Sequence, residues 1–159
     1  MRAYQIFAGM NPDHAVRVLD TLRESSPAVY THAVAAASAA FKARPRFLMS
    51  QAPDRRAQMM RRALARVAAS DLAEEVLAAY FLEARKELLV EWLDAVGVEH
   101  EDGALTGERP EAPPRKKLEE AVDGFLAADD EPDRELLLRA FAAQSAIEWP
   151  DLEARFGEG

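Results

Sequence analysis

Residues 71–97 read DLAEEVLAAYFLEARKELLVEWLDAVG, and neither proline nor glycine interrupts them before the last position. Asp71 followed by Glu74 is a capping-box pattern for a helix start, and Gly97 stands where a left-handed glycine commonly ends a helix. At about 3.6 residues per turn, the apolar side chains fall in two neighbouring stripes. The stripes are Leu77, Phe81, Ala84, Leu88 and Trp92, and Leu82, Leu89, Leu93 and Val96. We therefore predict one continuous helix with neighbours on more than one side, at the centre of an all-helical domain.

Prolines mark further helix starts along the chain. Asn11-Pro12 and Ser26-Pro27 each place a capping residue before a proline, which is favoured at the first helical position. Together with apolar periodicity, these signals predict about six main helices. They cover roughly residues 12–25, 27–43, 53–69, 72–96, 115–128 and 132–146.

The predicted fold class is all-α, a single-domain bundle over residues 1–159. Two helical hairpins, Pro53–Gly97 and Arg115–Phe156, are expected to pack on the N-terminal helices. Lys86–Ala95 can also be aligned with Arg134–Ala143, at an offset near the period of HEAT-like repeats. That similarity leaves a helical repeat, two stacked hairpins, as an open alternative.

A long connection separates the two predicted hairpins. Residues 99–114 are rich in glycine, proline and acidic side chains and have few apolar anchors. Connections of this length inside compact domains are usually functional or mobile. We predict a mobile loop here.

Composition excludes several classes of protein. The chain has no cysteine, which rules out disulfides, thiolate metal sites and a cysteine nucleophile. It has no apolar run of transmembrane length and no apolar leader at its start, so we predict a cytoplasmic protein without a membrane partner. The net charge of -8 disfavours general nucleic-acid binding. No sequence pattern assigns a catalytic residue, a metal ligand or a cofactor.

The basic residues are concentrated in one segment. Residues 42–66 hold eight lysines and arginines and a single acid, Asp54, so their net charge is +7. Because the whole chain carries -8, the remaining residues carry -15. On a helix that starts at Pro53, Arg55, Arg62 and Arg66 share one stripe, and arginines in a row bind carboxylates or phosphates well. The candidate partner-binding residues are Lys42, Arg44, Arg46, Arg55, Arg62 and Arg66.

An acidic row offers a different reading. Glu83, Glu87, Glu91 and Asp94 recur at helical spacing on residues 72–96. Carboxylate rows bind metals in some helical bundles, although those sites also use Glu-x-x-His pairs that this chain lacks. A solvated helix face explains the row as well.

The sequence thus predicts a non-enzymatic interaction or regulatory protein whose basic segment contacts an acidic protein surface or another anionic partner. A nucleic-acid-associated regulator that uses the same basic face is the first alternative. Aromatic residues for base stacking are scarce in the segment, which weakens it. A metal-binding or enzymatic bundle that uses the acidic row and His100 is the second.

Overall fold

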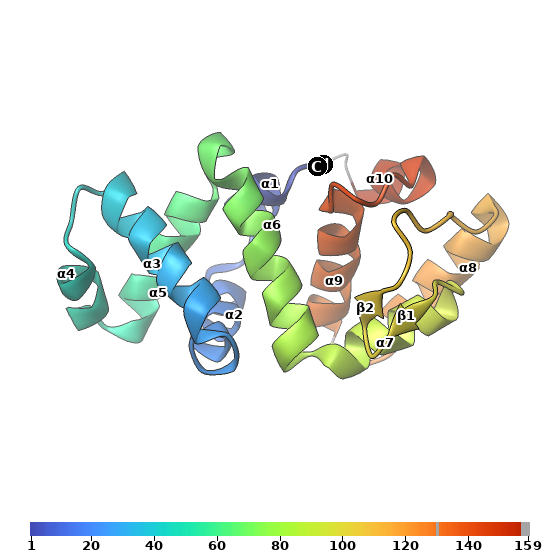
Figure 1. Cartoon of the computed structure of the whole chain (residues 1–159), viewed down its shortest axis with the longest axis horizontal. Helices are drawn as coiled ribbons and strands as arrows, with labels where there is room; N and C mark the ends of the chain where they lie inside the picture. Colours follow the sequence, from blue (N-terminus) through green and yellow to red (C-terminus); the bar gives the residue numbers. More distant parts are fainter. Residues whose placement is uncertain (130, 157–159) are drawn as a thin grey trace. The chain divides into compact units, whose positions relative to one another are not determined.

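The computed structural model describes residues 1–129 and 131–156, and the predicted all-α class is confirmed (Figure 1). The elements are α1 (Ala3–Gly9), α2 (Pro12–Ser25), α3 (Pro27–Ala40), α4 (Pro45–Ser50), α5 (Pro53–Leu64), η1 (Val67–Ala69), α6 (Ser70–Ala79), η2 (Tyr80–Ala84), α7 (Lys86–Ala95), β1 (His100–Glu101), β2 (Ala104–Leu105), α8 (Arg115–Leu126), α9 (Glu131–Ala143) and α10 (Pro150–Phe156). None of these described helices has both the length and the apolar character that a membrane crossing requires.

The proline-marked helix starts are confirmed. The Asn11 side-chain oxygen accepts hydrogen bonds from the backbone amides of Asp13 and His14, at 2.8 and 3.4 Å, and so caps α2. The helices α3 and α5 begin at Pro27 and Pro53. A side-chain cap therefore supports the start of α2, whereas α3 and α5 start at their prolines without a side-chain cap.

The prediction of one continuous helix over residues 71–97 is wrong. α6 gives way to η2, a π-helical turn, and then Arg85 leaves the helical region with φ -129° and ψ 42° before α7 begins. The start also differs, because α6 begins at Ser70 without any side-chain cap. The end is as expected: Gly97 has φ 71°, and the amide of Val98 donates to the carbonyl oxygen of Leu93 at 2.9 Å.

A long-range ion pair accompanies the break at Arg85. Its guanidinium is paired with the buried carboxylate of Asp133 on α9, and it donates to Glu87 on α7 at 2.8 Å. The interruption of the helix thus coincides with a long-range ion pair that the local helical pattern does not indicate.

Contacts divide the chain into two compact units that meet between Ala84 and Arg85. In the unit of residues 2–84, α5 packs against α1, α2, α3 and α6, and Figure 1 shows α3 and α5 side by side with α4 at their end. Phe7, Leu22, Met60 and Leu77 are among the fully buried side chains of this unit. The predicted burial of Phe81 is also confirmed.

In the unit that begins at Arg85, α9 packs against α7, α8 and α10. Its core is aromatic. Trp92 contacts Phe125 and Phe141, with ring centroids 5.5 and 6.0 Å apart, and Phe141 contacts Trp149 at 5.1 Å. Trp92 is fully buried, as predicted. Whether the two units form one domain stays a prediction.

The acidic connection contains a short β-hairpin that was not predicted, and its mobility stays a prediction. β1 and β2 pair antiparallel, His100 with Leu105 and Glu101 with Ala104, around the turn Asp102-Gly103 (Figure 1). Both turn residues have positive φ, which is what the two-residue hairpin turn requires.

Candidate functional site

The basic segment, residues 42–66, contains two helices, α4 and α5, and the helix predicted over residues 53–69 is shorter than expected. α5 ends at Leu64, and Arg66 follows it in extended backbone, with φ -86° and ψ 142°, as the residue before η1. The predicted single stripe is therefore wrong for Arg66. Arg55 and Arg62 stay on α5, two turns apart.

All six candidate residues are exposed. Within the described part of the chain, none of them has an ion-pair partner, although Arg66 donates to the carbonyl oxygen of Ala40 at 3.4 Å. Their charges are consequently directed to solvent. The set is Lys42, Arg44, Arg46, Arg55, Arg62 and Arg66, which we call the basic face.

The two remaining arginines of the segment hold the fold together. Arg56 is buried and donates to the carbonyl oxygens of Met49 and Gln51, each at 3.3 Å. Arg61 donates to the Gln58 side chain at 2.9 Å and to the carbonyl oxygen of Phe7 at 3.2 Å. These two arginines therefore use their donors within the fold, and Arg56 also lies 3.9 Å from the Asp20 carboxylate.

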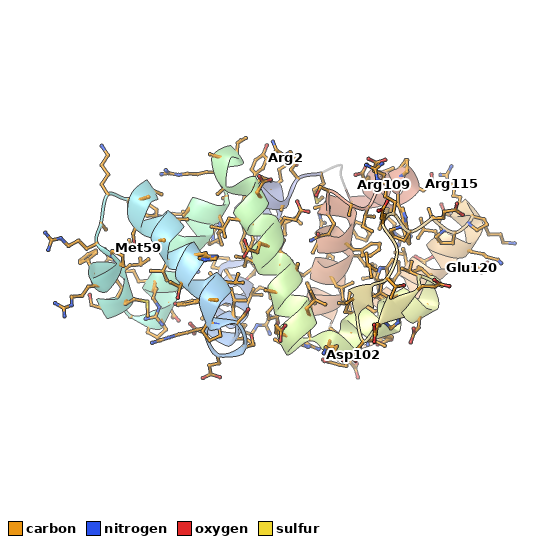
Figure 2. The ribbon with its side chains drawn as sticks, in the orientation of Figure 1. Arg2, Met59, Asp102, Arg109, Arg115 and Glu120 are labelled. Atoms are coloured by element: carbon orange, nitrogen blue, oxygen red, sulfur yellow. The ribbon has the colours of Figure 1, made fainter. Side chains whose placement is uncertain are left out.

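A hollow of about 460 Å³ opens on the basic face. It is lined by Phe41, which follows α3, and by Arg55, Gln58, Met59 and Arg62 of α5; Met59 is labelled in Figure 2. The Arg66 guanidinium lies 5.7 Å from the centroid of the Phe41 ring. The hollow thus brings together Arg55 and Arg62, and Arg66 lies beside its Phe41 wall. Lys42 is next to Phe41 in the chain, whereas Arg44 and Arg46 belong to α4 and its start and do not line the hollow.

Exposed apolar side chains accompany the cations. Among the described residues, the large apolar side chains that stand out to solvent are Phe47, Val67 and Leu105, at 51%, 57% and 37% exposure. Two of the three lie on α4 and η1, beside the basic face in the chain. Arginines interspersed with exposed apolar groups are typical of protein interaction surfaces. Helical spacing places Val67 on the buried side of the predicted helix, which is wrong, and gives no role to Met59, so this apolar component was not predicted.

The acidic row does not gather into a site. Glu87 is bound by Arg85, Glu91 receives both Arg134 nitrogens at 2.9 Å, and Asp94 contacts His100 at 2.7 Å. Burial alone would raise the pKa of Glu87, but its hydrogen bond from Arg85 and the nearby positive charge leave that pKa lowered. Within residues 1–129 and 131–156, no cluster of three or more histidine, aspartate or glutamate side chains could hold a metal.

Comparison with protein-family models, with curated proteins and with solved structures finds no match. The functional reading therefore rests on the geometry and charge of the basic face.

Proposed function

We propose that this chain is a non-enzymatic interaction protein whose basic face binds an acidic protein surface. One observation carries the proposal: of the eight cations in residues 42–66, two are committed to backbone carbonyls, while six are exposed without an ion-pair partner in the described chain. A chain of net charge -8 has many carboxylates with which these cations could pair. Their exposure leaves a local positive field that attracts acidic partners.

The test is a triple variant, Arg55→Gln, Arg62→Gln and Arg66→Gln. Exposed charges add little to folding, so the thermal midpoint should stay within a few degrees of wild type. Binding to poly-L-glutamate, a defined anionic polypeptide, should weaken by roughly tenfold or more and should fall with added salt in the wild type. Isothermal calorimetry or fluorescence anisotropy measures the change.

A matched control removes the same charge elsewhere. Arg17, Lys116 and Lys117 are exposed and lie outside residues 42–66, so replacing all three by glutamine should leave poly-L-glutamate binding within about twofold. If poly-L-glutamate binding weakened equally in both variants, net charge alone would explain the effect and the basic face would have no special role. Tighter, salt-sensitive binding of duplex DNA than of poly-L-glutamate would favour the nucleic-acid alternative instead.

A further inference from the structure

The hollow on the basic face has a regular chemical pattern. Arg55, Met59 and Arg62 recur at spacings of four and three on α5, so they share one face of that helix. The two arginines are about 10 Å apart along the axis, since each residue rises about 1.5 Å. A positive charge, an apolar side chain and a second positive charge therefore follow one another along the hollow.

Two residues of the lining, Phe41 and Gln58, are held by neighbouring side chains. Phe41 closes one side, and the guanidinium of Arg66 lies over its ring. Gln58 is fixed by two hydrogen bonds: it accepts from Arg61, and its amide donates to the carbonyl oxygen of Pro12 at 3.0 Å. The lining is thus partly preorganised, which reduces the entropy cost of binding a side chain there.

We propose that the hollow receives one apolar side chain of an acidic helical segment, with Arg55 and Arg62 pairing with carboxylates on either side of that anchor. This inference rests on the proposed function and specifies its partner. Charge complementarity selects an acidic segment, and the spacing of the arginines matches two glutamates two turns apart on a helix. An apolar anchor between them fits the Met59 and Phe41 surfaces. Phosphate backbones offer no such anchor, so the geometry favours a protein partner.

The probe is an alanine-based helical peptide with two glutamates two turns apart and one leucine between them. Two companion peptides carry serine in place of the leucine, or glutamine in place of both glutamates. Wild-type protein should bind the parent peptide roughly tenfold or more tightly than the serine peptide, because a leucine side chain leaves water. The glutamine peptide should bind as weakly as the serine peptide or more weakly.

Variants of the protein separate the two contributions. Met59→Ser should remove the preference for leucine over serine while leaving the serine peptide's affinity unchanged. The matched control is Met49→Ser, a half-buried methionine on α4 that does not line the hollow; it should retain the preference. Arg55→Gln with Arg62→Gln should weaken both acidic peptides and spare the glutamine peptide. Thermal melts of each variant establish that it is folded.

The outcomes distinguish the inference from the proposed function. If the protein binds the leucine and serine peptides equally well, and this binding still depends on Arg55 and Arg62, the apolar anchor is wrong but the acidic partner of the proposed function stands. If replacing both arginines leaves the affinity for the acidic peptides unchanged, the inference and the proposed function are both wrong. Sedimentation tests a further outcome. If the wild type formed a concentration-dependent dimer and the double arginine variant stayed monomeric, the hollow would bind a second copy of the chain, contrary to the proposal.

Discussion

Lys42 occupies a backbone position that favours glycine. It follows α3 with φ 51°, and the amides of Lys42 and Ala43 donate back to the carbonyl oxygens of Ala39 and Ser38, at 3.3 and 2.9 Å. The same motif ends α7, where the corresponding residue is Gly97. A lysine in this conformation costs free energy that a glycine avoids. Strain retained at an exposed cation is consistent with a role in binding.

Lys42→Gly is therefore expected to stabilise the fold by about 1 kcal/mol, a rise of about 2–4 °C in the thermal midpoint. It should at the same time weaken poly-L-glutamate binding, because it removes one charge of the basic face. Calorimetric melts and anisotropy measure the two effects. Lys42→Ala removes the charge but keeps the strain, so it should weaken binding without the gain in stability. A glycine variant that is no more stable than the alanine variant would contradict the strain assignment.

At the residue scale, the sequence distinguished exposed cations from structural ones only in part. The six candidates are all exposed, and the two arginines left out of that set are less exposed and donate to backbone carbonyls, as Arg66 also does among the six. Helical spacing accounts for this on α5, since Arg56 and Arg61 fall outside the stripe of Arg55 and Arg62. Arg134 shows the limit of such reasoning. It pairs with Glu91, 43 residues away, and stacks on Phe125, and neither contact has a local signal.

At the element scale, helix starts with capping residues and prolines were predictable, and the break before α7 was not. Residues 80–85 contain no proline or glycine, and the helix ends there beside an ion pair between Arg85 and Asp133, 48 positions apart. The β1–β2 hairpin is a different case. Asp102-Gly103 is a strong local signal for a tight turn, but the flanking strands have only two residues each and lack an alternating apolar pattern.

The indole of the buried Trp149 makes one of several contacts that hold the acidic connection, alongside the ion pairs of Asp102 and Arg109. The Trp149 indole N–H donates to the carbonyl oxygen of Pro110 at 2.8 Å, next to the exposed Arg109. Trp149→Phe keeps an aromatic ring in the core but removes that donor. Losing a hydrogen bond of about 1 kcal/mol should speed cleavage after the exposed Glu108 by a glutamate-specific protease about fivefold. In the wild type, the chain should be cut there before it is cut after any helical glutamate.

The control for that experiment is Trp92→Phe. It makes the same truncation at a buried indole whose N–H has no hydrogen-bond partner in the described chain. Cleavage after Glu108 should then change only as far as overall stability changes, which a denaturation curve reports. If cleavage were accelerated equally in the two variants, the effect would come from loss of core packing, and the Trp149 hydrogen bond would not restrain the connection.

At the scale of the whole molecule, the open question is cooperativity. The chain's contacts separate into two units at Arg85, each with its own buried core. Domain boundaries usually fall in flexible linkers, whereas residues 70–95 are helical except at Arg85 and contain neither proline nor glycine. We therefore retain the prediction of a single domain, in which the loss of one core destabilises both units.

The distribution of tryptophan makes this prediction testable. Both tryptophans of the chain, Trp92 and Trp149, lie in the unit that begins at Arg85, so their fluorescence reports on that unit, while circular dichroism reports on helices of both. Phe81→Ala empties a buried site in the other unit and should cost roughly 3–5 kcal/mol. In one cooperative domain, the fluorescence and dichroism transitions move together to lower denaturant. Phe47→Ala, at an exposed site, should move neither. If the dichroism transition moved alone while the fluorescence midpoint stayed at the wild-type value, the two units would be separate domains divided at Arg85.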